Sequence, residues 1–388
     1  MRILYDARKI TLQPMGVGYV VKKLLEQLLT DKDLEMVALT KKGIKNIFDP
    51  PLSQNLIIHE TDDDSEYFGL KRVFFEQINL LKIINFYKPD LLHLTNGFSV
   101  PFLLDKKQVH LKILLTIHDL IPLTPFCEFM SKTDRFVFKN FLYYSVKQAD
   151  AIVSVSETTK KDIHRYFPST KNIQTIANGM ESLSLPVTEV EKNWPLIKKK
   201  YQLKNDFICY IGSFSPRKNI LSLVKAYYLI CKKYPSYQLV LCGRFSDNPY
   251  IQKIINEVKN FSKEKNLENN IKIIGYLSTA EKSTLLTKAK FFAYLSLYEG
   301  FGLPVLESLS VGTPVLTSQQ SAMEEIAQNY ALYADPNNVD DMAQKMIEIM
   351  TSYPHYKKKA EEAKLSLVPQ FNWKKTGKLY IEQYLKLK

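Results

Sequence analysis

The stretch "AKFFAYLSLYEGFGLPVLESLSVGTPVLTS" (residues 289–318) predicts a complete strand–helix–strand unit. Its first eight residues are apolar almost throughout, which is typical of a parallel strand buried on both faces. Glycines then make a tight loop, Pro304 fits the first turn of a helix, and a second apolar strand follows at 313–318. Because a helix that joins two strands in this way gives a βαβ unit, the stretch predicts an α/β domain with a parallel sheet.

The same alternation extends over the rest of the chain in two series. Further strand-like runs lie at 2–7, 35–40, 90–95, 112–120, 151–156 and 173–178, and then at 207–213, 237–243 and 271–276. Between the two series, residues 179–200 have little periodicity and read as a linker followed by a short helix. We therefore expect two doubly wound α/β domains in tandem, 1–183 and 184–370, as the length of 388 residues also suggests.

Composition and charge limit the function classes. The net charge is +13, with the larger excess after residue 185, and it fits a phosphate-bearing ligand, an anionic membrane surface or simply a Lys-rich surface. A nucleic-acid partner is not expected, because we find no interleaved basic and aromatic platform. The four cysteines lack C-x-x-C spacing, which predicts free thiols in a reducing compartment and no zinc site.

The chain is expected to be cytoplasmic, and any contact with the inner face of the membrane to be peripheral. Residues 2–7 read as a charged strand and not as a signal peptide. No uncharged apolar run reaches the roughly 18 to 20 residues of a membrane span. Residues 62–84 mix acidic, basic and aromatic residues, and their apolar face could meet a lipid-linked acceptor or the core; we favour the core.

Polar residues follow several predicted strands, at the sheet edge where α/β proteins bind ligands. "QPMGVGYV" (13–20) places Gly16 and Gly18 before the first helix, where backbone N–H groups could meet an anion; an ordinary strand–helix turn is the alternative. "TIHDLIPL" (116–123) places His118 after a strand, where it could donate a hydrogen bond to a substrate oxygen or be satisfied by local backbone.

A cationic turn follows the first strand of the second series. In "YIGSFSPRKNI" (210–220) the strand ends at Gly212, and Arg217, Lys218 and the expected helix cap Asn219 come after a proline turn. Two adjacent cations beside a helix N-terminus suit a doubly charged phosphate group. A solvated basic turn is the alternative.

Two carboxylates flank the glycine loop of the opening stretch. Glu299 precedes the loop of Gly300 and Gly302, and Glu307 lies about one turn into the following helix. Either carboxylate alone would be read as a helix cap or a surface group. The pair with this glycine pattern favours a binding role.

Together these motifs resemble glycosyltransferase family 4, whose members are retaining enzymes of the GT-B fold. The resemblance covers nearly the whole chain and includes "VSVSETTKKDI", "IANGM", "LVLCG" and "IGYLSTAEKSTLL"; the E-x7-E segment at 299–307 is its most specific mark. The chain looks most like bacterial mannosyl- and rhamnosyltransferases of envelope polysaccharides, including lipopolysaccharide. It departs from the family at Glu181, in "NGME", and after Ser318, where the usual Asn or Gly run is missing.

The resemblance implies two Rossmann-like domains that face a central cleft. The N-terminal domain (1–183) would bind the acceptor and would be completed by a C-terminal crossover helix at about 371–388. The C-terminal domain (184–370) would bind a nucleotide-sugar donor. No cofactor and no metal would be required, because cationic side chains would take the place of a divalent ion.

The resemblance also implies roles for single residues in the donor domain. Glu307 would hold the ribose hydroxyls and Glu299 the donor sugar. Arg217 and Lys218 would neutralise the leaving diphosphate. The other expected donor-binding residues are Gly212, Tyr276, Leu277, Gly300, Phe301, Gly302 and Leu303, of which Tyr276 and Leu277 would pair with the base through their backbone.

In the N-terminal domain, Gly16 and Gly18 would close on the same diphosphate, and His118 would lie near the anomeric centre. The expected function is transfer of a sugar from a nucleoside-diphosphate sugar, with a GDP-mannose-like donor favoured, to a saccharide or lipid-linked saccharide. The alternatives are a nucleotide-sugar epimerase on the same fold and a non-catalytic nucleotide-sugar-binding subunit.

Overall fold

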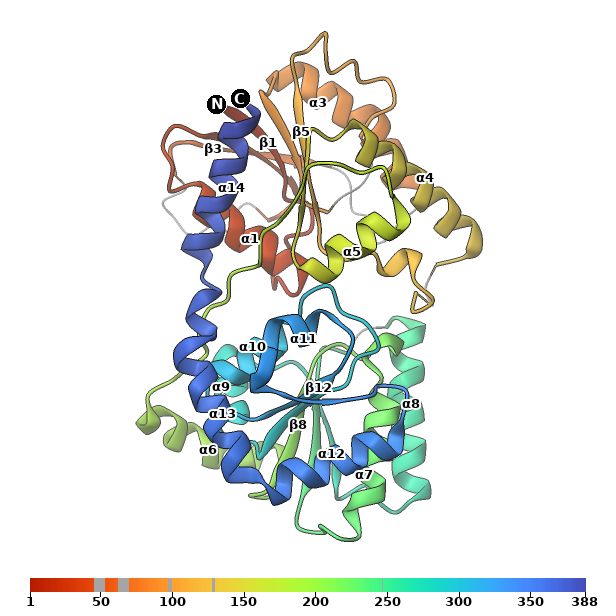
Figure 1. Cartoon of the computed structure of the whole chain (residues 1–388), viewed down its shortest axis with the longest axis vertical. Helices are drawn as coiled ribbons and strands as arrows, with labels where there is room; N and C mark the ends of the chain where they lie inside the picture. The colour runs from red at the N-terminus through yellow and green to blue at the C-terminus, as the bar shows by residue number, and fades with distance from the viewer. Residues whose placement is uncertain (45–52, 62–69, 97–99, 128–129, 246) are drawn as a thin grey trace. The chain divides into compact units, whose positions relative to one another are not determined.

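The computed structural model describes residues 1–388 except 45–52, 62–69, 97–99, 128–129 and 246 (Figure 1). Contacts within the chain divide it into two compact units. The first consists of Met1–Gly179 and Phe371–Lys388, and the second of Met180–Gln370. This boundary, after Gly179, lies four residues before the one that the sequence predicts, after residue 183.

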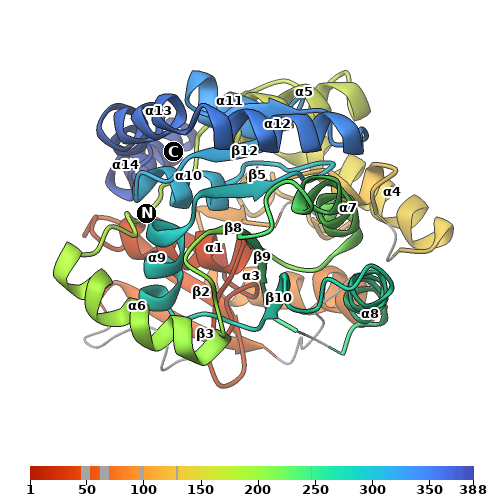
Figure 2. The ribbon, with the colours of Figure 1, turned by 90° about the horizontal axis from the view of Figure 1, so that it is seen from below.

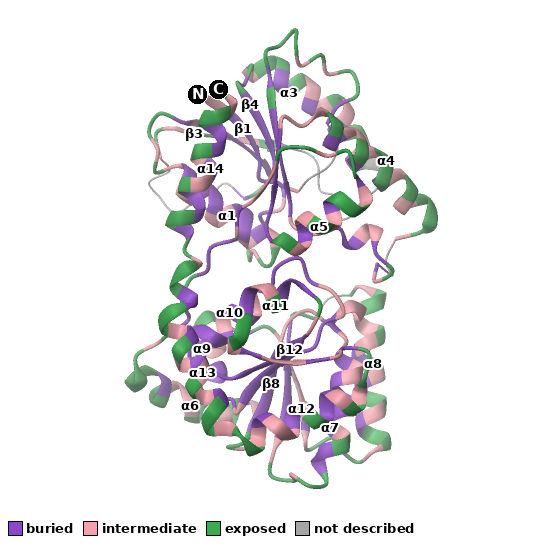
Figure 3. Ribbon diagram, viewed as in Figure 1, coloured by how far each residue is buried: buried purple, intermediate pink, exposed green. Residues whose placement is uncertain are grey.

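The first unit is built on a seven-stranded parallel sheet in the order β3-β2-β1-β4-β5-β6-β7. Its strands are β1 (Arg2–Asp6), β2 (Glu35–Lys41), β3 (Leu56–Thr61), β4 (Leu91–Leu94), β5 (Lys112–Ile117), β6 (Ala151–Ser154) and β7 (Ile173–Thr175). Its helices are α1 (Val17–Leu28), α2 (Leu70–Phe74), a π-helical turn (Phe75–Asn79), α3 (Leu80–Tyr87), α4 (Lys132–Gln148), α5 (Glu157–Tyr166) and α14 (Trp373–Leu387). β4, β5 and β6 are buried almost completely, which explains their continuous apolar runs (Figure 3).

The second unit is built on a six-stranded parallel sheet in the order β10-β9-β8-β11-β12-β13. Its strands are β8 (Phe207–Ile211), β9 (Gln238–Cys242), β10 (Ile271–Ile274), β11 (Phe291–Tyr294), β12 (Val315–Ser318) and β13 (Leu332–Ala334). Its helices are α6 (Val187–Tyr201), α7 (Ile220–Cys231), α8 (Pro249–Glu264), α9 (Thr279–Lys288), α10 (Leu303–Ser310), α11 (Ala322–Ala327), α12 (Val339–Thr351) and α13 (Tyr353–Ser366). Helices cover both faces of this sheet (Figure 2).

Both sheets are doubly wound, as the sequence predicts. The strand order reverses between β1 and β4 in one unit and between β8 and β11 in the other. At such a switch point the loops after the two central strands run to opposite faces of the sheet, which opens a crevice at their carboxyl ends. The loops after β8 and β11 contain the cationic turn and the glycine loop.

Helix α14 is fixed to the first sheet by a buried polar network. The imidazole of His93 on β4 bonds the Tyr384 hydroxyl at 2.6 Å and the Thr116 hydroxyl at 2.8 Å, and Thr116 bonds Tyr380 at 3.1 Å. Burial lowers the pKa of His93 to about 3, so the ring is neutral and can donate from one nitrogen and accept at the other. The last helix of the chain is therefore an integral part of the first unit.

The structure also corrects several local predictions. β3 and β13 were not predicted, because both are edge strands that are only partly buried and so lack a continuous apolar run. The short helix predicted at the end of residues 179–200 is the 15-residue helix α6, which is longer than expected and contains Pro195. Asn219 stands at the N-cap of α7, but its φ is 58° and its side chain donates to the Pro336 carbonyl instead of capping the helix.

In the described part of residues 62–84 one set of apolar side chains packs into the core, whereas Phe74 and Ile78 are 58% and 41% exposed. Leu80, Ile83 and Ile84 belong to the main cluster of the first unit, as favoured from the sequence. Residues 62–69 lie outside the described part. Within the described residues, no helix combines the length and apolarity needed to cross a membrane.

Replacement of Gly243 by alanine should destabilise the second unit. Gly243 follows β9, and an added Cβ would lie 2.0 Å from the Gly212 carbonyl oxygen, so backbone would have to move. We expect Gly243→Ala to lower the free energy of unfolding by at least about 2 kcal/mol in urea denaturation. Gly275→Ala is the control, because its Cβ would meet only Phe245, at 3.6 Å. Equal effects of the two substitutions would contradict this assignment.

Candidate active site

The switch point of the second unit brings the cationic turn and Glu299 together. Arg217 and Lys218 lie in a single 3-10 turn, Pro216–Lys218, which follows β8. The Leu297 N–H, in the loop after β11, donates to the Arg217 carbonyl at 2.8 Å. This backbone bond ties the two loops to each other and fixes the side chains that follow.

Glu299 forms a buried ion triad with both cations. One carboxylate oxygen, Oε1, accepts from Arg217 Nη1 at 2.7 Å and from Lys218 Nζ at 2.5 Å. Lys218 is 6% exposed and Glu299 8% exposed, so the alternative of a solvated basic turn is wrong. Burial raises the pKa of the Glu299 carboxyl, but the positive charges of Arg217 and Lys218 outweigh it and hold this pKa at about 2.

Tyr294 of β11, which was not predicted, contacts two members of the triad. Its hydroxyl lies 3.3 Å from Glu299 Oε1 and accepts a hydrogen bond from Lys218. Its ring stacks on Tyr210 of β8, whose hydroxyl donates to the Ser213 carbonyl at 2.7 Å. Burial raises the pKa of Tyr294, so the phenol stays protonated. The sequence gives no signal for this contact, because a tyrosine in an apolar strand reads as core.

The triad holds two positive charges and one negative charge in a poorly solvated place. Its net positive charge favours an anionic ligand, and the carboxylate can accept hydrogen bonds from hydroxyl groups. Arg217, Lys218 and Glu299 are thus preassembled in one cluster. The resemblance had assigned them to different parts of the ligand. This arrangement orients Arg217 and Lys218 before any ligand arrives.

The glycine loop leads directly into α10. Gly302 is the N-cap residue at a φ of 121°, and in the described part of the chain no side chain caps this helix. A Cβ on Gly302 would lie 3.0 Å from the Met323 side chain. Phe301 is buried. Position 302 therefore favours glycine because of its backbone conformation, and a Cβ there would also require the Met323 side chain to shift.

Glu307 pairs with a lysine that sequence reasoning missed. Lys282 on α9 places its Nζ 2.6 Å from Glu307 Oε1, and the two side chains are 24% and 20% exposed. Lys282 stands 25 positions before Glu307, so no local pattern could reveal the pair. It leaves the second carboxylate oxygen of Glu307 as an acceptor for hydroxyl groups.

The remaining donor-side candidates differ in exposure and packing. Tyr276 is 52% exposed, whereas Leu277 is buried. A Cβ on Gly212 would lie 2.6 Å from the Tyr210 hydroxyl, so this glycine is required by packing within the site. Gly300 is buried and Leu303 opens α10.

Gly16, Gly18 and His118 belong to the first unit. Gly16 caps α1 at a φ of 53°. A Cβ on Gly18 would lie 2.3 Å from the Lys9 carbonyl oxygen, so Gly18 is required for packing against Lys9. Gly16, Gly18 and His118 lie in the first unit, and the donor-side candidates lie in the second.

Backbone satisfies the His118 ring, which is the alternative that the sequence left open, although the partner is 23 positions away. Its Nε2 lies 2.9 Å from the Thr95 carbonyl oxygen, which can only accept. Burial lowers the pKa of His118 to about 4, so the ring is neutral and Nε2 carries its single proton. Nδ1 is then an acceptor, suited to a substrate hydroxyl.

Comparisons with known proteins give the family. A model described as "Glycosyltransferase Family 4" matches residues 15–182, and one described as "Glycosyl transferases group 1" matches residues 195–366. O-antigen chain mannosyltransferase B of Escherichia coli is 27% identical over 399 residues, which cover 99% of each chain.

Solved structures agree in fold. Sucrose-phosphate synthase of Thermosynechococcus elongatus superposes with a TM-score of 0.80 at 19% identity, covering 100% of this chain and 98% of that one. Anabaena HepE, solved with UDP and glucose, gives a TM-score of 0.75 at 15% identity and covers 100% of both. The predicted GT-B fold is confirmed, and the chain belongs to glycosyltransferase family 4.

Proposed function

We propose that this protein is a retaining hexosyltransferase that moves mannose from a GDP-mannose-like donor to a saccharide or lipid-linked saccharide of an envelope polysaccharide. The buried triad of Arg217, Lys218 and Glu299 at the switch point carries this proposal. The name of the similar Escherichia coli protein supports mannose as the sugar and an O-antigen chain as the class of product.

The triad suits the departure of a nucleoside diphosphate. When the bond between the anomeric carbon and the diphosphate oxygen breaks, negative charge develops on the leaving oxygen. Arg217 and Lys218 are already fixed by Glu299 and can stabilise that charge without reorganisation. The acceptor hydroxyl forms the new bond on the same face of the sugar, and its proton passes to the departing diphosphate.

The two glutamates serve different parts of the donor in this proposal. Glu299 accepts hydrogen bonds from sugar hydroxyls while it orients the cations. Glu307 accepts from the ribose hydroxyls, and Lys282 fixes its carboxylate. The N–H groups of the loop at Gly300–Leu303 line the space between them, and Tyr276 and Leu277 offer their backbone to the base.

Two alternatives differ from this proposal in the product. An epimerase would act on the nucleotide sugar alone and would release a changed sugar without an acceptor. A non-catalytic binding subunit would hold the donor without turnover. The assembled cation pair favours chemistry at the diphosphate over both.

The donor can be identified by thermal shift. GDP-mannose should raise the unfolding temperature more than UDP-glucose at equal concentration. A larger shift with UDP-glucose would overturn the GDP-mannose assignment while leaving the triad's role intact.

Loss of Lys218 should impair turnover more than donor binding. We expect Lys218→Ala to lower kcat by a factor on the order of 10²–10³, because it removes charge stabilisation that acts in the transition state. Calorimetry should show a smaller loss of nucleotide affinity. Tyr294→Phe is the control, since it keeps all three charges and should retain most activity. Unchanged kcat in Lys218→Ala would remove the leaving-group role.

Loss of Lys282 should raise the KM for the donor and leave kcat nearly unchanged. A hydrogen-bonded charge of this kind contributes roughly 1.5–3 kcal/mol, so Lys282→Ala should weaken donor binding about tenfold or more, and Glu307→Ala at least as much. Lys288→Ala is a matched control, because Lys288 lies on the same helix, is 24% exposed and pairs with Glu191 at 2.6 Å. Equal KM values for the two lysine variants would refute the role of Lys282.

Activity should survive removal of divalent ions. Arg217 and Lys218 supply the positive charge at the diphosphate, so the rate of transfer in EDTA should match the rate in buffer without added metal. A rate that collapses in EDTA and returns with Mn²⁺ would show that the cation pair is insufficient.

A further inference from the structure

Helix α4 of the first unit turns a row of basic and aromatic side chains to solvent. Lys132, Phe136, Lys139, Tyr143 and Lys147 recur at spacings of three and four residues, so they share one side of the helix. All five are exposed, Phe136 to 69% and Tyr143 to 41%. These five residues form what we call the basic-aromatic face, and Leu103, which is 84% exposed, lies in the loop that packs on Phe141 and Tyr144 of the same helix.

Packing explains only part of this exposure, because Tyr143 stacks on Phe167 and Lys147 Nζ lies 4.6 Å from the centroid of the Tyr143 ring. Phe138, Leu142 and Val146 hold α4 against the core from its other side. Arg135 is turned away from the basic-aromatic face, because its Nε donates to the Pro122 carbonyl at 3.0 Å. Asp134, the single acidic residue of Lys132–Gln148, bonds Ser131 at the helix N-terminus. The basic-aromatic face therefore carries positive charge without acidic neighbours on its own helix.

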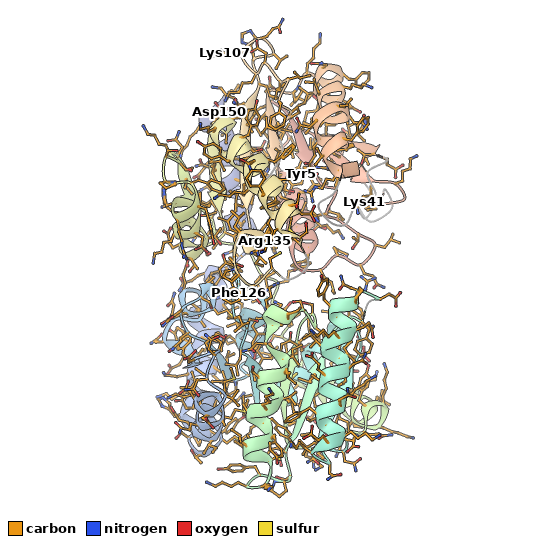
Figure 4. All side chains as sticks on the ribbon, turned by 90° about the vertical axis from the view of Figure 1, so that its right-hand side faces the viewer. Tyr5, Lys41, Lys107, Phe126, Arg135 and Asp150 are labelled. Atoms are coloured by element: carbon orange, nitrogen blue, oxygen red, sulfur yellow. The ribbon has the colours of Figure 1, made fainter. Side chains whose placement is uncertain are left out.

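The loop with Leu103 is fixed beside the helix. Phe102 packs on Phe141 and Tyr144 of α4, with ring centroids 5.0 and 4.6 Å apart. The Tyr144 hydroxyl also donates to the Phe102 carbonyl at 3.3 Å. Leu103 is thus an ordered apolar residue next to α4. Figure 4 looks onto the side of the unit where α4 runs between Arg135 and Asp150.

We propose that the basic-aromatic face docks the protein on an anionic lipid bilayer. Phenylalanine and tyrosine side chains enter the boundary between headgroups and acyl chains, while lysines reach the anionic headgroups with their long stems. A protein partner fits less well, because protein interfaces are depleted in lysine. The expectation that the chain lacks an interleaved basic and aromatic surface is therefore wrong. The row recurs only at helical spacing, and the modest net charge of the first half of the chain does not show where the lysines gather.

Bilayer docking deepens the proposed function and rests on it in one respect only: it would bring the enzyme to a lipid-linked acceptor. The basic-aromatic face shares no residue with the proposed transfer site. Binding to vesicles requires no turnover, so a failure of docking and a failure of the proposed reaction can be told apart.

The test is co-sedimentation of the full chain with vesicles. The protein should sediment with vesicles of phosphatidylglycerol and phosphatidylcholine and stay in solution with phosphatidylcholine alone. Replacing Lys132, Lys139 and Lys147 together by glutamine should lower the partition coefficient on the order of a hundredfold, from the usual contribution of a basic residue near such a surface. Phe136→Ser with Tyr143→Ser should lower it while leaving the charge unchanged.

The matched control removes three exposed lysines from α8 in the second unit, Lys253, Lys259 and Lys263, where Glu257 and Glu264 are interspersed. This variant should bind vesicles like the wild type, and circular dichroism should show that all variants are folded. Equal losses in both triple variants, no vesicle binding at all, or a stronger preference for a single-stranded oligonucleotide than for vesicles would each overturn the proposal.

Discussion

The structure of the second unit depends on the Glu299 carboxylate, which stays ionised although it is buried. Isolated burial of Glu299 would favour its neutral form, and two cations reverse that preference. Each cation is in turn acceptable in the interior only because Glu299 is there. The requirement for mutual neutralisation therefore fixes the loops after β8 and β11 in one arrangement.

That constraint connects the fold to the chemistry. The doubly wound order places β8 beside β11, so residues 82 positions apart in the sequence, Arg217 and Glu299, meet at one end of the sheet. Gly212 leaves room for Tyr210, and Tyr210 supports Tyr294 against Lys218. A site organised in this way resists rearrangement, which is what stabilisation of a developing charge requires.

The fold could be predicted from the sequence because its parallel strands are buried on both faces and read as continuous apolar runs. The edge strands β3 and β13 lack that signal because they are only partly buried, and the helix predicted at the end of residues 179–200 is longer than expected. Residue types in the loops after strands pointed to Arg217, Lys218 and Glu299, but their joint contact depends on tertiary structure. Lys282, Tyr294 and the tautomer of His118 could not be predicted, since each depends on a partner distant in sequence.

A crystal structure of the protein with bound GDP-mannose would test the central claim most directly. The account predicts the diphosphate within hydrogen-bond distance of Arg217 and Lys218, the ribose hydroxyls on Glu307 and the sugar hydroxyls on Glu299. A nucleotide that binds away from the loops after β8 and β11, and that makes no contact with Arg217, Lys218 or Glu299, would contradict the account.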